Sequence, residues 1–370
     1  MTQRIYAGTR KGLFAIDRTR SGWEVSKTAL LGDPISVLLP ETDGVVTVAQ
    51  ALGHFGVKIK RSTDGAESFE ERPVPVYPEQ PEGVEDIDPI HKTPIPWDLK
   101  SVWSLETGGE DRPDELWCGT IPGGLFHSSD RGDNWQLIET LWYHDGRKQW
   151  MGGGADYPGI HSVCVDPRDS STVRIGVSCG GIWSTYDHGE TWAVEGVGLR
   201  ADYAPPEYAK EPNGQDAHRV VQCKESPDTV WIQHHNGIFL SRDAGRSCDE
   251  ITDVDPSVFG FAVVVHPEDP DSAWFVPGVK DEFRYPVDGK LVVTRTRDGG
   301  KSFEKLTDGL PQEHAYDLVY RHAMDIDASG DSIAFGSTTG NLFVSDNQGD
   351  HWQSVSHTLP PIHCVRFAPD

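Results

Sequence analysis

TYDHGETW, residues 185–192, is one copy of an eight-residue phrase that recurs along the chain. The phrase begins with a hydroxyl residue, has Asp or Asn third and usually Gly fifth, and ends with an aromatic residue. Its copies are Ser62–Phe69, Ser128–Trp135, Thr185–Trp192, Ser241–Cys248, Thr296–Phe303 and Ser345–Trp352. A repeat at intervals of about 45 to 65 residues is typical of propellers and other repeat architectures.

Each copy lies inside a longer unit of four short predicted strands, because alternating apolar residues and turn signals surround it. The unit around residues 161–195 repeats at 35–74, 100–139, 218–252, 261–306 and 322–356. The remaining strands are predicted at Arg4–Tyr6, Leu13–Ile16, Trp23–Ser26 and Ile362–Ala368. We expect the last strand to pair with the first ones. The pattern predicts an all-β, seven-bladed β-propeller that occupies residues 1–370 as one domain.

The repeated phrase resembles the Asp-box, or BNR repeat. Its carboxylate can accept backbone N–H bonds and its Gly permits a positive φ, so we expect a structural turn between the third and fourth strands of each blade. The whole chain is similar to bacterial BNR-repeat proteins described as glycosyl hydrolases or exo-α-sialidase-like, which are relatives of the sortilin propeller. The stretches GIHSV, WIQHHNGI and GSTTG, residues 159–163, 231–238 and 336–340, carry this resemblance. The N-terminal Phe/Tyr-Arg-Ile-Pro motif of true sialidases is absent.

Composition excludes several classes of partner. The formal net charge is −25, which disfavours nucleic acids and anionic membranes. No run approaches about 18 apolar residues, and the first residues lack the pattern of a secretory signal, so we expect a cytoplasmic protein.

The six cysteines show no CxxC pairing and are expected to be free thiols. Closure of the propeller removes sheet edges, so we expect a monomer.

Long insertions between the blades are predicted to form a binding face, opposite the face of the repeated turns. They hold many aromatic and polar residues, as binding pockets do. They lie at Pro73–Asp98, Glu139–Ile160, Gly196–Ala217 and Leu306–Arg321, with a further extended turn at Val276–Gly289.

Histidine recurs at one position of the predicted innermost strands. When the blades are aligned on the repeated phrase, the first residues of these strands are Ile35, Lys100, His161, His218, Phe261, His322 and His363. Imidazoles that converge at the top of the axis can share a divalent cation, so we predict a metal centre ligated by His161, His218, His322 and His363. Its ion would be Fe, Mn, Zn or Cu. A hydrogen-bonded core role for each histidine remains the alternative.

This arrangement resembles two propeller families, the carotenoid cleavage oxygenases and the oligogalacturonate lyases, which hold a metal on axial histidines. The analogy implies a lyase, hydrolase or oxygenase that acts on a small organic or carbohydrate-like substrate. The candidates for proton transfer are Lys100, His234, His235, Glu313 and Tyr316. Carboxylates that can orient the ligand rings are Asp156, Asp216, Glu313 and Asp317.

Two further hypotheses stay open at this point. A metal-free glycosidase would use paired carboxylates, with Asp156, Asp216, Glu207 and Glu313 as candidates. A non-catalytic propeller would instead bind a protein on its insertion-rich face.

Overall fold

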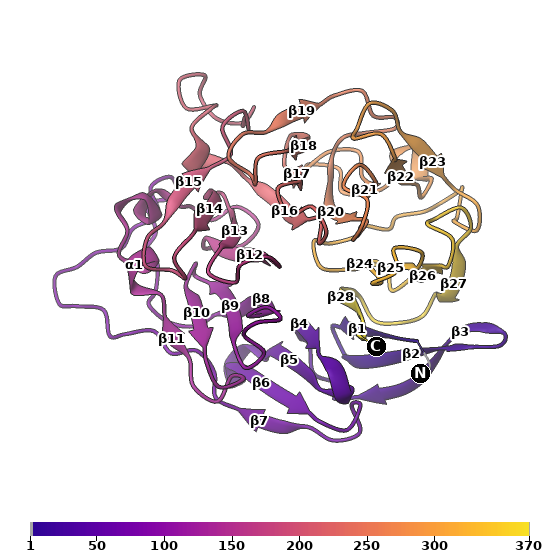
Figure 1. The fold of residues 1–370 in the computed structure, drawn as a ribbon, viewed down its shortest axis with the longest axis horizontal. Helices are drawn as coiled ribbons and strands as arrows, with labels where there is room; N and C mark the ends of the chain where they lie inside the picture. The colour runs from indigo at the N-terminus through magenta and orange to yellow at the C-terminus, as the bar shows by residue number, and fades with distance from the viewer. Residues whose placement is uncertain (1–2, 370) are drawn as a thin grey trace. The chain divides into compact units, whose positions relative to one another are not determined.

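The computed structural model describes residues 3–369 and is built from antiparallel β-strands with a few short helices (Figure 1). Within the described residues the strands form seven separate four-stranded sheets. These are the seven blades expected of a β-propeller, so the predicted fold class is confirmed. No helix in this part of the chain is long and apolar enough to span a bilayer.

The chain divides into two compact units, described separately below. The first unit extends to Leu52, includes Ile59–Glu71 and resumes at Ile251. The second unit contains Gly53–Lys58 and Arg72–Glu250. The prediction of one domain over residues 1–370 stays a prediction.

The first unit holds the blade that joins the two ends of the chain. Strand β28 (Ile362–Phe367) pairs with β1 (Arg4–Thr9), as predicted, and the sheet continues through β2 (Gly12–Thr19) and β3 (Gly22–Ala29) (Figure 1). The next blade, which falls mainly in this unit, contains β4 (Ile35–Pro40), β5 (Val46–Ala51), β6 (Val57–Ser62) and β7 (Glu70–Arg72). The other two blades contain β20 (Gly260–Val265), β21 (Ala273–Pro277), β22 (Val293–Thr296) and β23 (Glu304–Leu306), then β24 (Met324–Ile326), β25 (Ile333–Gly336), β26 (Leu342–Ser345) and β27 (Gln353–Ser356).

The second unit holds three blades. The first contains β8 (Ser101–Thr107), β9 (Leu116–Ile121), β10 (Leu125–Ser128) and β11 (Gln136–Leu137). The second contains β12 (Gly159–Val165), β13 (Val173–Ser178), β14 (Gly181–Thr185) and β15 (Ala193–Glu195). The third contains β16 (Ala217–Gln222), β17 (Val230–His234), β18 (Gly237–Ser241) and β19 (Asp249–Ile251). The short helices of the chain are α1 (Glu139–Trp142) and the 3₁₀ turns η1 (Thr42–Gly44), η2 (Gly53–Phe55), η3 (Asp145–Gln149), η4 (Pro212–Gly214) and η5 (Val287–Gly289).

Large aromatic side chains fill the core between neighbouring blades of each unit. In the second unit, Trp117 and Trp183 are fully buried in one apolar cluster with Ile160 and Ile175. In the first unit, Trp274 and Trp352 have the same role. Burying a side chain of this size contributes several kcal/mol, on the order of 3–5 by the cost of truncating it to alanine.

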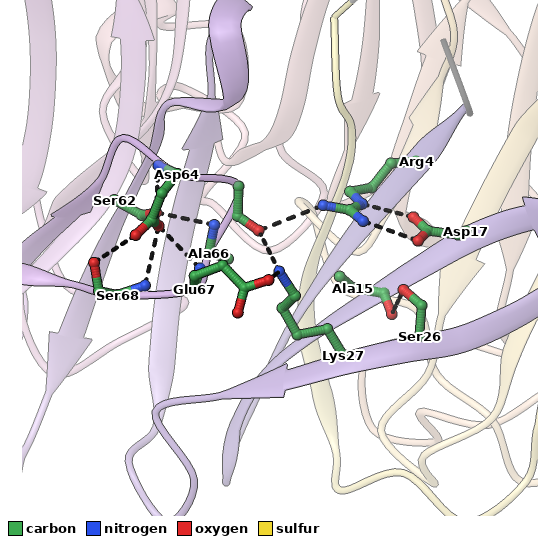
Figure 2. Close-up of polar contacts among 11 residues, drawn as sticks. Arg4, Ala15, Asp17, Ser26, Lys27, Ser62, Asp64, Ala66, Glu67 and Ser68 are labelled. Atoms are coloured by element: carbon green, nitrogen blue, oxygen red, sulfur yellow. Dashed lines mark hydrogen bonds and ion pairs between the residues drawn. The ribbon is translucent and has the colours of Figure 1, made fainter.

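The repeated phrase forms the expected turn before the fourth strand of a blade. At the first copy, Ser62 Oγ accepts a hydrogen bond from the Ala66 N–H at 2.9 Å, and Asp64 Oδ1 accepts one from the Ser68 N–H at 3.0 Å (Figure 2). Ser68 Oγ donates to the second oxygen of Asp64. The copy at 185–192 repeats the pattern. Each copy therefore satisfies its own backbone donors locally, which explains why the phrase recurs.

The turn carboxylates are expected to make stability fall in acid. Hydrogen bonds from the side chain four residues later hold the pKa of Asp64, Asp130, Asp187 and Asp298 below the usual value. A carboxyl whose folded pKa is depressed stabilises the fold above its unfolded pKa of about 3.9, and this stabilisation is lost as the pH falls below that value. The midpoint of urea unfolding should therefore drop between pH 5 and 3.

The acid dependence should become shallower in Asp187→Asn, because the amide oxygen still accepts the N–H bond but no longer titrates. Asn347 naturally occupies the equivalent position and accepts from the His351 N–H at 2.9 Å. Asp253→Asn, an exposed position outside the repeated turns, is the matched control. Equal pH profiles for Asp187→Asn and Asp253→Asn would contradict the assignment.

Candidate functional site

Three of the four predicted metal ligands lie at β-bulges. The strand pairing skips one residue between Ile160 and Ser162, and again between Ala217 and Arg219, so His161 and His218 are the extra residues. The pairing of β28 with β1 skips His363 in the same way. Bulges re-aim side chains and are common beside functional sites.

The bulges correct the sequence alignment in two blades. In β4 the skipped residue is Ser36, so Ser36 and not Ile35 corresponds to the bulge histidines. In β8 the skipped residue is Trp103, so Trp103 and not Lys100 corresponds to the histidines of the next two blades. Lys100 precedes β8, is exposed, and its Nζ lies 2.8 Å from Asp98 Oδ2. Alignment on the repeated phrase identified the correct innermost strand. It could not reveal the bulge, which adds one residue within that strand.

The structure brings together three of the side chains that the sequence had suggested for separate roles. Asp216 directly precedes β16, His218 is the second residue of that strand, and His235 directly follows β17. Because β16 and β17 are antiparallel neighbours, with Ala217 opposite His234, all three side chains lie at the same end of the blade. We call Asp216, His218 and His235 the Asp216 cluster.

Asp216 Oδ2 is the centre of this cluster. It lies 3.4 Å from His218 Nε2 and 3.4 Å from His235 Nδ1. One ligand atom from each of the three residues lies within 4.8 Å of the others. Asp216 and His218 are buried, whereas His235 is partly exposed, so the cluster is open to solvent on the side of His235.

The two 3.4 Å distances match metal ligation. Two atoms bound at 2.0–2.1 Å to one tetrahedral ion are separated by about 3.3–3.4 Å. Two neutral imidazoles and one carboxylate are also a donor set that Zn, Fe, Mn or Cu accepts. The residues therefore fit a divalent transition metal, with positions left for water or substrate.

The remaining oxygen of Asp216 is held by its surroundings. Asp216 Oδ1 accepts hydrogen bonds from Ser178 Oγ and from the Cys179 N–H, both at 3.3 Å. The His235 N–H donates to the Asp216 carbonyl at 2.9 Å. These contacts fix the carboxylate so that Oδ2 faces the two imidazoles. In metal sites, residues that hydrogen-bond to a ligand commonly orient it in this way. Tyr203 packs edge-on against His235, with ring centroids 5.0 Å apart.

The other two histidines of this unit that the sequence singled out, His234 and His161, have different environments. His234 is completely buried, and burial lowers its pKa to about 3, so its ring is neutral. Its Nδ1 accepts from the Asn236 N–H at 3.1 Å. His161 is also buried, and its Nδ1 lies 2.9 Å from Ser162 Oγ. Among the described residues, neither of these two histidines joins the group of close ligand atoms that contains His218.

Four further predicted residues, His322, His363, Glu313 and Tyr316, belong to the first unit. His363 Nδ1 lies 3.0 Å from the Ile35 carbonyl oxygen, and His322 is buried beside Cys364, with which it forms a β-bridge. Glu313 and Tyr316 are exposed. The four-histidine centre and the roles of Lys100, His234, Glu313 and Tyr316 in proton transfer stay predictions. The exposed candidates Asp156 and Glu207 lie in the loops of the second unit.

A second group of close ligand atoms was not predicted from the sequence. Glu115 Oε2 lies 2.9 Å from His188 Nε2 and 3.1 Å from His127 Nε2. These are hydrogen-bond distances, and an Arg112 guanidinium nitrogen lies 3.3 Å from His188 Nε2. The fixed positive charge disfavours a cation there. Burial opposes ionisation of Glu115, but hydrogen bonds from His188, His127 and Arg112 hold its pKa below the usual value.

The insertions of the second unit are interlocked. Asp86 forms a buried ion pair with Arg147 and accepts a bond from Trp97 Nε1 at 3.0 Å. Asp88 Oδ2 accepts from the Gly152 N–H at 2.8 Å. Further along, Trp150 Nε1 donates to Asn213 Oδ1 at 3.0 Å. The three insertions at residues 73–98, 139–160 and 196–217 thus form an ordered surface, and its role as a binding face stays a prediction.

No family model matches the chain. A stretch of 93 residues is 40% identical to an oligoxyloglucan-reducing end-specific xyloglucanase of Emericella nidulans and covers 25% of this chain and 10% of that protein. A stretch of 108 residues is 31% identical to a probable enzyme of the same description from Neosartorya fischeri and covers 29% and 12%. The matches therefore span only 10% and 12% of these curated relatives.

Solved structures share the fold at low sequence identity. A protein from Lactobacillus plantarum has a TM-score of 0.60 at 10% identity and 99% coverage of both chains. The periplasmic gluconolactonase of Pseudomonas aeruginosa has a TM-score of 0.57 at 11% identity, with 100% and 99% coverage. An ancestral GH74 enzyme has a TM-score of 0.58 at 14% identity and covers 86% of this chain and 38% of its own. The chain is thus similar to propellers that include hydrolases.

Proposed function

We propose that this protein is a metal-dependent hydrolase that acts on a small sugar-like substrate. Asp216, His218 and His235 would be the protein ligands of one divalent transition-metal ion. The spacing of 3.4 Å between Asp216 Oδ2 and each imidazole nitrogen carries the proposal. The likeness to gluconolactonase and GH74 propellers, and the partial match to xyloglucanases, support a sugar-derived substrate.

The chemistry follows from the charges of the cluster. A bound divalent ion would activate water and polarise a carbonyl or glycosidic oxygen. Asp216 contributes one negative charge, so the loaded site keeps net positive charge for the oxygen that becomes negative in the transition state. Ser178 and Cys179 hold Asp216 in place, and the partly exposed side of His235 leaves room for substrate.

A metal requirement for hydrolysis tests this proposal. Chelator-treated protein would be assayed with a sugar lactone, a p-nitrophenyl ester and p-nitrophenyl glycosides, each with and without added Zn, Mn, Fe(II) or Cu(II). We expect hydrolysis of at least one substrate only when a metal is present, and a loss of at least about 100-fold in His235→Ala.

His188→Asn is the matched control, because it removes an imidazole from the Glu115 group and Asn tolerates its positive φ of 58°. This variant should keep full activity. Equal hydrolysis in metal-free protein would contradict the proposal and favour the carboxylate-based glycosidase. Failure of all these substrates with every metal would also count against a metal-dependent hydrolase.

A further inference from the structure

A second candidate site lies in the first unit and shares no residue with the Asp216 cluster. It is a pocket of about 480 Å³ bordered by Tyr285, Asp288, His314 and Tyr316, together with Val279, Val287 and Gly289. This volume lies within the usual range for small-molecule sites, about 300–1,000 Å³. The lining comes from the extended turn between β21 and β22 and from the insertion between β23 and β24.

The two segments that form the pocket are joined by backbone hydrogen bonds. The Ala315 N–H donates to the Gly289 carbonyl at 2.9 Å, and the Leu291 N–H donates to the Pro311 carbonyl at 3.0 Å. The Gln312 side-chain amide adds a bond to the Leu291 carbonyl at 2.8 Å. The walls are therefore positioned before any ligand arrives, which lowers the cost of binding.

Aromatic faces are exposed at this pocket. Tyr316 is 61% exposed and Tyr285 is 38% exposed, although both rings are large and partly apolar. Their centroids lie 6.3 Å apart, and the neighbouring Phe283, 49% exposed, lies 6.4 Å from Tyr285. A contiguous group of exposed aromatic side chains beside a pocket marks a binding surface.

The polar groups of the pocket are available to a ligand. Within residues 3–369, the side chains of Asp288, His314 and Tyr316 form no hydrogen bond or ion pair. Asp288 and His314 also have positive φ angles, 56° and 55°, which favour glycine.

We infer that this pocket binds one residue of a neutral saccharide. The apolar C–H face of a sugar ring fits the exposed tyrosine faces, and sugar hydroxyls both donate and accept hydrogen bonds. The Asp288 carboxylate accepts, the His314 ring can do either, and the tyrosine hydroxyls do both. The net charge of −25 and Asp288 disfavour an anionic ligand.

A cationic ligand is the less favoured alternative. Lys280 Nζ already lies 5.1 Å from the centre of the Phe283 ring, so this face has a cation of its own. Asp288 is the only carboxylate among the residues that line the pocket. The saccharide site does not need the proposed metal, because none of the residues that line it belongs to the Asp216 cluster.

Titration calorimetry with a xyloglucan heptasaccharide tests the inference on chelator-treated full-length protein. We expect saturable binding that weakens at least about tenfold in each of two variants. Tyr316→Ala loses the contact with the tyrosine ring, and Asp288→Asn loses the charged acceptor. Tyr208→Ala is the matched control, since Tyr208 is also 61% exposed but lies in the second unit. Because the protein is chelator-treated, binding at this pocket is measured without the proposed metal, which separates this result from the fate of the metal proposal.

Three outcomes would overturn the inference. They are no heat of binding by the wild-type protein, unchanged affinity in both pocket variants, and tighter binding of choline than of the heptasaccharide. The last outcome would instead identify a cation site.

Discussion

Replacing His218 with alanine is expected to abolish the stabilisation that a divalent transition metal gives the wild-type protein. A ligand that binds only the folded state at a hundredfold excess over its Kd stabilises it by about 2.7 kcal/mol. His218 supplies a ligand atom 3.4 Å from Asp216 Oδ2, and without it only two protein ligands remain. Thermal unfolding with and without Zn, Mn, Fe(II) and Cu(II) measures the effect.

The buried position of His218 calls for a second variant, because His218→Ala can also weaken the fold. His235→Ala removes a partly exposed ligand and should lose the metal-induced shift while keeping the metal-free stability near that of the wild type. His188→Asn should keep the full shift. A full metal-induced shift in both cluster variants would show that the ion binds elsewhere, and the absence of a shift in the wild type would refute the site.

Replacing Asp86 with alanine is expected to cause the largest loss of stability among single changes in the insertions. The Asp86 carboxylate pairs with Arg147, and both side chains are almost fully buried. The Arg147 guanidinium also lies 3.6 Å from the centre of the Trp142 ring. Removing only the carboxylate leaves a buried charge without its partner, which costs about 3–5 kcal/mol.

Urea unfolding of Asp86→Ala, Arg147→Met and the double variant measures this cost. The double variant should be more stable than Asp86→Ala, because no unpaired charge remains. Because residues 3–369 divide into two compact units, the slope of each transition must be compared as well as its midpoint. A destabilisation below about 0.5 kcal/mol in Asp86→Ala would contradict the role of this ion pair.

Much of the fold could be predicted because its signals are local. The repeated phrase closes its own hydrogen bonds within eight residues, so each copy marks the end of a third strand wherever it occurs. The pairing of β28 with β1 followed from counting strands, since the last blade would otherwise be incomplete. These inferences needed no knowledge of distant contacts.

The candidate site was predicted only in part. The sequence singled out His218, His235 and Asp216, but for three different roles, because it does not show that the ends of β16 and β17 meet. The bulge that makes Trp103 the counterpart of His161 depends on strand pairing, which a repeat alignment does not contain. The pairing of Asp86 with Arg147, 61 residues apart, and the group around Glu115 likewise depend on tertiary contacts.

An anomalous diffraction measurement on crystals of the metal-reconstituted protein tests the central claim most directly. The account predicts one strong peak bonded to Asp216 Oδ2, His218 Nε2 and His235 Nδ1, at about 2.0–2.2 Å from each atom. A metal peak at other ligands, or none at these three atoms despite saturating metal, would contradict it.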